Sequence, residues 1–391
     1  MQQFDVVVLG AGMVGAAVAL GFARKSFNVA IVEPNMPAAF NPSSTPDLRV
    51  SAISLASESL LSALGVWDSI AAMRVHPYRR LAVWEDESSF TEFDASDSSG
   101  EAHSRMGHMV ENRVIQLGIH QALSESKNVH WFNHYHGLNE DTGELTLNDD
   151  IAAKAQLVIV AEGAQSSARQ NAGIATQGWQ YRQSVLSITV KCHHDEHQQK
   201  ESDLTWQRFV SGCPKAFLPL FDDYAALIWY DQIPVIQRLT QLSNNELKKR
   251  IISAFPERLP DFDIVETGAF PITRMHAQRY FKGRMVLVGD SAHTINPLAG
   301  QGVNLGFKDV EALLKHVTQV EDASLLQSQL LAYEQSRKPQ NLLMMSTMDA
   351  IYNVFASDAL PLKFARNVGL KLANNMGWAK DKVMRYAMGL N

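Results

Sequence analysis

The N-terminal residues carry a strand–turn–helix–strand pattern that restricts the fold more than any other part of the chain. Phe4–Leu9 predicts a buried strand, Gly10-Ala-Gly-Met-Val-Gly15 a tight turn, Ala16–Lys25 a helix of small residues, and Val29–Val32 a second strand ending at Glu33. In dinucleotide-binding folds the first glycine makes the turn, the second admits a pyrophosphate, and the third lets the helix pack on the strand. An acid after the second strand binds a ribose hydroxyl and repels a 2′-phosphate. The pattern predicts a Rossmann-like domain for FAD or an NAD-like nucleotide, and not for NADP.

Residues 283–309 form a second strand–loop–helix segment. The apolar run Met285–Val288 predicts a buried parallel strand that presents Gly289-Asp290 at its end, where such sheets bind ligands. A polar loop closed by Pro297 follows, and apolar residues at helical spacing predict a helix that starts near Gly300-Gln301-Gly302. Uncovered amides at a helix start favour negative charge. The segment therefore predicts an acceptor, Asp290, beside an anion-binding helix start.

A third strand end carries a similar combination of residues. The apolar run Leu157–Ala161 leads into Glu162-Gly163, and Ser166 and Arg169 follow at positions that suit a helix cap and a phosphate contact. His293 lies in the loop after Asp290, where it could be a catalytic residue or a buried structural histidine.

Two further polar groups could face a nucleotide or only water. Arg49 precedes a predicted helix at 57–64 and could bind a phosphate or remain a surface charge. Gly107–Ala122 predicts an amphipathic helix that carries Asn112, Arg113 and Gln116.

Length and composition exclude several classes of protein. A chain of 391 residues with 46% hydrophobic residues, 19% charged residues and a net charge of −6 is large enough for two domains, and it lacks the basic balance of a nucleic-acid-binding protein. Cys192 and Cys213 lack the spacing of zinc or redox sites, and His193-His-Asp-Glu-His197 cannot place all its side chains on one ion. Glycines interrupt the apolar run Phe4–Ala23, which argues against a membrane span. We expect a cytoplasmic protein without a metal.

The predicted domain organisation follows from a change in the sequence pattern after residue 180. Short strand-like runs separated by turns cover residues 183–231, and Asn244–Ala254 predicts a helix that covers them. We expect an antiparallel sheet inserted into the nucleotide-binding domain as a substrate platform. The predicted units are a discontinuous FAD-binding domain (1–75, 101–180 and 268–340), a substrate-binding sheet domain (76–100 and 181–267) and a C-terminal helical tail (341–391).

The end of the chain is basic, although the whole protein is acidic. Residues 361–391 carry six lysines and arginines against the single acid Asp381, together with apolar residues at helical spacing. This tail could dock on an anionic membrane surface or an acidic partner, or it could pack on its own domain with a solvated basic face.

The order and spacing of the three strand-end motifs resemble the FAD-dependent aromatic hydroxylases of the para-hydroxybenzoate hydroxylase type. Within that family, several stretches look like the ubiquinone-biosynthesis hydroxylases. These stretches are Arg49-Val-Ser-Ala-Ile-Ser54, Gly65-Val-Trp67, His76-Pro-Tyr-Arg-Arg80, Met109-Val-Glu-Asn112 and the run from His293 to Gly306. The resemblance covers nearly the whole chain. It departs at Glu162, where the family usually has Asp.

The resemblance implies how each motif serves the cofactor. The glycine turn and Glu33 would hold the ADP half of FAD, Arg49 its phosphate or ribityl region, and Asp290 a ribityl hydroxyl. Amides from Gly300 to Gly302 would face the N1–C2=O edge of the flavin. The implied cofactor residues are Gly10, Gly12, Gly15, Glu33, Arg49, Asn112, Arg113, Glu162, Gly163, Gly289, Asp290, Gly300, Gln301, Gly302, Val303 and Asn304, and the implied catalytic residues are His293 and Pro297.

The resemblance also implies a reaction. NAD(P)H reduces FAD, O₂ is captured as a C4a-hydroperoxyflavin, and hydroxyl passes to the ring of a polyprenylated benzoquinol. The quinol hydroxyls activate the ring, so the protein mainly positions the substrate and excludes water. Two alternatives share the fold, namely a flavin reductase of a prenylated substrate and a non-catalytic prenyl-binding protein. The implied location is the cytoplasm, with peripheral contact through the basic tail to the inner face of the membrane or to other ubiquinone-biosynthesis proteins.

Overall fold

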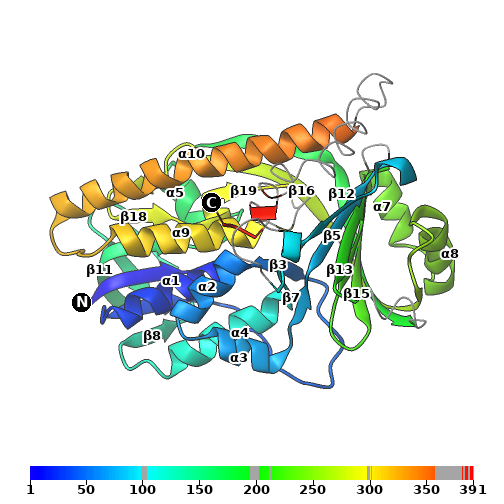
Figure 1. Cartoon of the computed structure of the whole chain (residues 1–391). Helices are drawn as coiled ribbons and strands as arrows, with labels where there is room; N and C mark the ends of the chain where they lie inside the picture. Colours follow the sequence, from blue (N-terminus) through cyan, green and yellow to red (C-terminus); the bar gives the residue numbers. More distant parts are fainter. Residues whose placement is uncertain are drawn as a thin grey trace.

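The chain forms two large β-sheets, a small three-stranded sheet and several helices (Figure 1). The computed structural model describes residues 1–97, 104–193, 202–210, 213–296, 300, 302–356, 381, 384–385 and 388–390. This mixed α/β architecture confirms the fold class predicted from the sequence.

The first sheet is the centre of the nucleotide-binding half. Its parallel strands run in the order β18-β11-β1-β2-β8, and β17 pairs antiparallel with β18 at the edge. The bounds are β1 (Gln2–Leu9), β2 (Val29–Val32), β8 (Val129–Phe132), β9 (Tyr135–His136), β10 (Glu144–Leu147), β11 (Ile151–Val160), β17 (Phe281–Lys282) and β18 (Met285–Leu287). Strands β2 and β18 are wholly buried, because a parallel sheet is covered on both faces.

Helices cover this sheet and complete its core. Helix α1 packs on β1 and β2 and contacts both α4 and α9. The bounds are α1 (Met13–Arg24), α2 (Leu55–Ala63), α3 (Trp67–Met73), α4 (Asn112–Ser124), α5 (Ser167–Asn171) and α9 (Gly302–His316). Nine consecutive residues of α1, from Gly15 to Ala23, are buried, so small side chains are needed where the helix meets the sheet.

The second sheet has the order β19-β16-β12-β15-β14-β13-β5-β6. Its bounds are β5 (Arg80–Trp84), β6 (Thr91–Asp94), β12 (Thr176–His193), β13 (Leu204–Arg208), β14 (Lys215–Pro219), β15 (Tyr224–Gln232), β16 (Asp261–Ala277) and β19 (His293–Thr294). Helices α7 (Ile233–Leu239) and α8 (Asn244–Ala254) contribute Ile236, Leu247 and Ile251 to the apolar core on one of its faces. The sheet is not wholly antiparallel, because β5 pairs parallel with β13.

The long helix α10 (Ala323–Ala356) joins the two halves (Figure 1). Its first turns place Leu326, Leu330 and Tyr333 in the core of the first sheet, and its later turns place Met345 and Met348 against the second sheet. The small sheet has the order β3-β7-β4, with β3 (Val50–Ser54), β4 (His76–Tyr78) and β7 (Gly107–Glu111). Helices α2 and α3 connect β3 to β4 in the sequence.

One element predicted from the sequence begins later than expected. Gly107–Glu111 forms strand β7, paired with β3 and β4, and only the residues from Asn112 onward form helix α4. All five residues of β7 are buried, so pairing and burial decide their conformation, and the apolar pattern alone does not separate the two states. Of the predicted helical tail, residues 357–380 lie outside the described residues.

Candidate cofactor and substrate site

Four strand ends bring the sequence motifs to one edge of the first sheet. Leu9 pairs with both Val160 and Val32, and Val160 pairs with Leu287, so these strands end side by side. The glycine turn, Glu33, the Glu162 loop and the Asp290 turn follow directly from these ends. Ligands of open α/β sheets bind at this carboxyl edge.

The three glycines of the turn have different surroundings. Gly10 has a φ of +93°, and a Cβ atom there would lie 2.6 Å from the Ala161 carbonyl oxygen. A Cβ atom on Gly15 would lie 2.0 Å from the Gly10 carbonyl oxygen. Gly12 is exposed, and no atom lies within 4 Å of the position of its missing Cβ. Gly10 and Gly15 are therefore needed for packing, whereas Gly12 leaves open space beside the backbone.

Glu33 is attached to this turn by its carboxylate. Its Oε2 atom accepts a hydrogen bond from the Ala11 amide at 2.7 Å, and its Oε1 atom accepts one from the Asn35 amide at 2.9 Å. Gln116 on α4 donates to the Ala11 carbonyl oxygen at 2.8 Å. The acid and the turn therefore form one unit, with Glu33 half-buried beside the open space at Gly12.

Asp290 combines exposure with an enclosed position. Its side chain is exposed to solvent, yet desolvation by the surrounding protein raises the pKa of its carboxyl, against the charges of His293 and Arg49, which lower it. A carboxylate that is accessible to solvent can accept a hydrogen bond from a ligand. Arg49 is itself exposed and lies over the Phe270 ring, 4.9 Å from its centroid.

The turn that carries Asp290 rests on the buried carboxylate of Asp309. This carboxylate accepts hydrogen bonds from the Gly289 amide at 3.1 Å, His293 Nε2 at 2.5 Å, Arg337 Nε at 2.8 Å and Asn341 Nδ2 at 3.1 Å. Burial alone would raise the pKa of Asp309, but the charges and hydrogen bonds of His293 and Arg337 outweigh it and lower this pKa to about 2. Asp309 therefore joins α9, α10 and the Asp290 turn.

His293 lies inside this network. Its side chain is 1% exposed, and its Nε2 atom faces Asp309. This placement favours the structural interpretation of His293 over the catalytic one. Pro297, the other predicted catalytic residue, lies outside the described residues.

The carboxylate of Glu162 accepts four hydrogen bonds, three from residues 166–168 and one from Tyr135 of β9. The Tyr135 and Ser167 hydroxyls donate to Oε1 at 2.7 and 3.0 Å, and the Ser166 hydroxyl and the Ala168 amide donate to Oε2 at 2.6 and 2.9 Å. Arg169, also buried, donates from its guanidinium to the Ser291 carbonyl oxygen at 3.0 Å. This loop is therefore fastened to the Asp290 turn by Arg169, and Glu162 organises the start of α5.

The start of α9 is held by Asn304. Its side-chain oxygen accepts from the Ser54 amide at 3.1 Å and the Ser57 hydroxyl at 2.8 Å, and its Nδ2 atom donates to the Ala52 carbonyl oxygen at 2.9 Å. Gly300 has a φ of +61°. Gly302 and Val303 are half-buried at the helix start, and Gln301 lies outside the described residues. Asn304 is 2% exposed and contacts protein rather than open space.

Three more predicted residues lie farther along the loops. Asn112 accepts from the Ser51 hydroxyl at 2.7 Å, and Arg113 forms an ion pair with Asp47 at 2.9 Å. Gly163 has a φ of +80°, and nothing lies within 4 Å of the position of its missing Cβ. Asn112 and Arg113 are thus paired with the segment that leads from Asp47 into β3.

Sequence reasoning missed Asp309, Arg337 and Asn341. A signal was present for Asp309, because it is a charged residue within the apolar helical stripe of Phe307, Val310 and Leu313. Its partners on α10 come from 28 and 32 residues farther along the chain, and no local pattern connects them.

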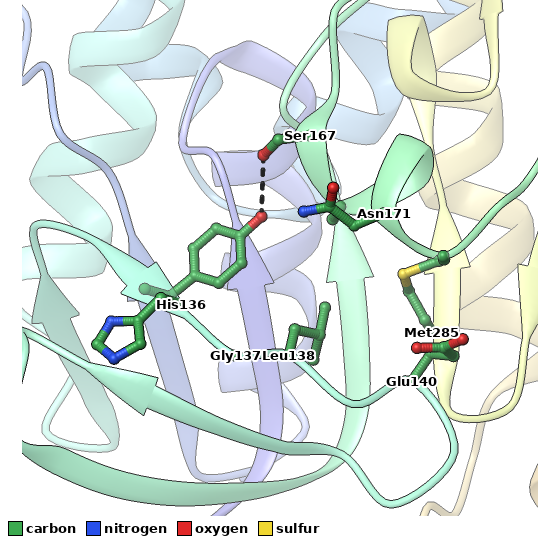
Figure 2. A pocket seen from close by; sticks show the side chains of 10 residues that line it. His136, Gly137, Leu138, Glu140, Ser167, Asn171 and Met285 are labelled. Atoms are coloured by element: carbon green, nitrogen blue, oxygen red, sulfur yellow. Dashed lines mark hydrogen bonds between the residues drawn. The ribbon is translucent and has the colours of Figure 1, made fainter.

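A cavity of about 290 Å³ lies beside α5 (Figure 2). Ser167 and Asn171 of α5, Met285 of β18 and Glu140 line it, and the Tyr135 hydroxyl contacts Ser167 at its edge. None of its lining residues belongs to the glycine turn, the Asp290 turn or the start of α9. The cavity is therefore separate from the open space at Gly12.

Within the described residues, no group of three or more histidine, cysteine, aspartate or glutamate side chains could hold a metal ion. No helix in the same part of the chain is both long enough and apolar enough to cross a membrane.

Comparison with known proteins shows the family. A family model of the FAD binding domain matches residues 3–346. The chain is 43% identical over 399 residues to 3-demethoxyubiquinol 3-hydroxylase of Escherichia coli (strain K12), covering 100% of this chain and 99% of the relative. It is 30% identical over 441 residues to the mitochondrial ubiquinone biosynthesis monooxygenase COQ6 of Mus musculus, covering 98% and 90%. The chain belongs to this family of FAD-dependent hydroxylases.

Solved structures show that the fold of the hydroxylase family extends over the chain. The p-nitrophenol 4-monooxygenase of Pseudomonas putida superposes with a TM-score of 0.77 at 16% identity, covering 100% of both chains. A probable FAD-dependent monooxygenase of Pseudomonas aeruginosa has a TM-score of 0.77 at 19% identity, covering 94% of this chain and 99% of the other. Family membership makes the protein an FAD-binding protein, and the open space at Gly12 and the accessible, enclosed Asp290 fit that cofactor.

The different surroundings of Gly12 and Gly15 lead to a first prediction. We expect Gly15→Ala to lower the free energy of unfolding by more than about 2 kcal/mol, because its methyl group would collide with the Gly10 carbonyl. Gly12→Ala should stay within about 1 kcal/mol of wild type and yet weaken FAD binding. Urea unfolding and FAD titration measure the two effects. Full FAD affinity in Gly12→Ala would contradict a pyrophosphate at this position.

His276 leads to a second prediction, which concerns pH. It is 5% exposed and lies across the β16–β19 pair from His293, and burial together with the nearby His293 lowers its pKa to about 4. The unfolded chain then binds more protons than the folded one between about pH 6.5 and 4, so stability is lost as pH falls through this window, by up to about 3 kcal/mol from this group. We expect His276→Gln to flatten this slope in urea unfolding. His136→Gln, at an exposed position, should keep the wild-type slope.

Proposed function

We propose that this protein hydroxylates the ring of a polyprenylated benzoquinol in ubiquinone biosynthesis, with NAD(P)H as electron donor and O₂ as oxygen donor. The proposed substrate is 2-polyprenyl-3-methyl-6-methoxy-1,4-benzoquinol. The observation that carries this proposal is the 43% identity to the Escherichia coli 3-demethoxyubiquinol 3-hydroxylase over the full length of both chains.

The proposed FAD site follows the carboxyl edge of the first sheet. The ADP half would lie over Gly12 beside Glu33, and Asp290 would accept from a ribityl hydroxyl. The amides at the start of α9 would face the N1–C2=O edge, where reduction places negative charge. When bound, FAD would accept two electrons from NAD(P)H and transfer them to O₂. Asp290 is the carboxylate we assign to FAD, because its side chain is accessible whereas that of Glu162 is engaged by four donors.

The proposed substrate side is the apolar region between the second sheet and the start of α9. Leu218 and Ile228 of the second sheet, Ala52 of β3 and Ile295, which follows β19, pack in the two adjoining apolar clusters of this region. Apolar walls suit a prenylated ring and keep water away from it. The quinol hydroxyls activate the ring, so the site needs to orient it and requires no strong acid–base pair. Accordingly, we propose that His293 positions the Asp290 turn through Asp309.

The division into an FAD-binding domain, a substrate-binding sheet domain and a tail remains a proposal, and the presence of two separate large sheets supports its first two units. The second sheet also takes residues assigned to the FAD-binding domain, because β12 begins at Thr176 and β16 ends at Ala277, and α10 runs across the proposed start of the tail. Strand β12 changes register between Gln180 and Ser184, close to the proposed boundary at 180/181. From the sequence we also propose peripheral contact of the basic tail with a membrane or a partner protein. Residues 357–380 of this tail lie outside the described residues. A cytoplasmic location is likewise a proposal from the sequence.

A third prediction tests the reaction. We expect the purified protein to be yellow and to oxidise NAD(P)H faster when a short-chain demethoxyquinol is added, with a product heavier by one oxygen atom in mass spectrometry. ¹⁸O₂ should supply that atom. Reduction of a prenyl double bond, without oxygen incorporation, would favour the reductase. A colourless protein that FAD cannot reconstitute would favour a prenyl-binding protein.

A fourth prediction compares the two carboxylates. We expect Asp290→Ala to weaken FAD binding by at least about tenfold, because it removes a charge-assisted acceptor in an enclosed position. Glu162→Asp should mainly loosen α5, with a smaller loss of FAD affinity. FAD titration of the refolded apoproteins, with thermal unfolding as a control for stability, measures both. The reverse order of FAD affinities would refute the assignment.

A further inference from the structure

The C-terminal residues lie at the centre of the molecule, beside β3 and the start of α2 (Figure 1). Met384 and Met388 are fully buried there, in an apolar cluster that also contains Tyr78, Met109 and Ala226. We call Met384 and Met388 the methionine pair. Their complete burial shows that these two side chains pack in the interior of the protein.

The backbone next to the methionine pair is in close contact with β3 and α2. The Ala56 amide donates to the Met388 carbonyl oxygen at 3.2 Å. Gly389 has a φ of +75°, and a Cβ atom there would lie 2.9 Å from the Ala56 Cβ and 3.1 Å from the Ser54 hydroxyl oxygen. Met388 and Gly389 therefore pack directly against Ser54 and Ala56.

Ser54 connects this contact to the proposed flavin edge. Its amide donates to Asn304, and Asn304 donates in turn to the Ala52 and Gly300 carbonyl oxygens. A Cβ atom on Gly300 would lie 3.3 Å from the Ala52 Cβ. The segment that supports the methionine pair is thus the segment that holds the start of α9.

The other side of the methionine pair faces the second sheet. Leu218, Ala226 and Ile228 pack in the same cluster. Ile228 also packs against the neighbouring cluster, which contains Ile295 and Leu305. The methionine pair therefore belongs to the apolar region in which we place the substrate.

We propose that Met384 and Met388 form the wall that closes the substrate side of the site against water. This inference rests on the proposed function. Methionine is unbranched and adaptable, so such a wall can yield to rings and prenyl chains without opening a gap. Water exclusion decides the fate of the two electrons from NAD(P)H. In a closed site, NAD(P)H, O₂, H⁺ and the ring C–H give NAD(P)⁺, the ring C–OH and H₂O. In a wet site, NAD(P)H, O₂ and H⁺ give NAD(P)⁺ and H₂O₂.

The test is the fraction of NAD(P)H oxidation that ends as H₂O₂, measured with the full-length, FAD-loaded protein and a short-chain quinol. Replacement of both methionines by glutamine keeps their length and adds polarity. We expect Met384→Gln/Met388→Gln to raise this fraction at least about threefold, with FAD content unchanged. Met384→Leu/Met388→Leu, which stays apolar, should couple as wild type does. A glutamine variant that folds, holds FAD and couples like wild type overturns the proposal.

Oxidative footprinting provides a readout that does not depend on turnover. In the FAD-loaded protein, Met384 and Met388 should be oxidised by added peroxide much more slowly than Met36, which is 57% exposed. A short-chain quinone should slow them further and leave Met36 unchanged. Absence of this protection overturns the wall, even if wild type hydroxylates quinols. If wild type hydroxylates no quinol, the proposed function fails, and protection of the pair would still assign it to a quinone-binding wall.

Discussion

The buried carboxylate of Asp309 is the interaction on which the site depends. Transfer of a carboxylate into a fully buried position costs several kcal/mol unless donors replace the water it loses. Here four donors do so, and they come from the Asp290 turn, from His293 and, on α10, from Arg337 and Asn341. Loss of a single partner from such a cluster typically costs about 3–5 kcal/mol. The cluster therefore locks α9 and α10 to the turn that presents Asp290.

This arrangement separates two kinds of acid at the carboxyl edge of the first sheet. Asp309 and Glu162 have their oxygens engaged by protein donors and maintain the loops, whereas Asp290 stays accessible. A ligand can only gain from an acceptor that the protein has left available, because an acceptor already satisfied must first lose its partner. The distinction explains why Glu can stand at position 162. Its longer side chain reaches Tyr135, Ser166 and the Ala168 amide, and this structural use does not require the geometry of a cofactor contact.

The sequence alone predicted the fold and the carboxyl edge well, because both depend on local patterns. Apolar runs that end in Gly-Asp, Glu-Gly or Gly-x-Gly-x-x-Gly mark strand ends, and parallel pairing then brings those ends together. It failed where long-range contacts decide. Gly107–Glu111 reads as the first turns of a helix but pairs as a strand with β3 and β4. Nor could local patterns predict the hydrogen bonds of the Asn304 side chain to Ser54, Ser57 and Ala52, which lie about 250 residues earlier in the chain.

The two halves of the site differ in what holds them together, and this difference suits their proposed tasks. The cofactor half is organised by hydrogen bonds with fixed directions, so it can present amides and Asp290 in one orientation. The substrate half is built from apolar side chains of the second sheet, β3 and the C-terminal residues, with methionines where the elements meet. Apolar contacts have little directionality, and methionines repack easily, so this half can adapt to a flexible prenyl chain without disturbing the first. Asn304 lies between the cofactor half and the substrate half. Its hydrogen bonds to Ser54 and Ala52 fix the position of β3, which borders the apolar substrate half. A ring held at that border would be oriented by the rigid half, while its chain is accommodated by the adaptable half.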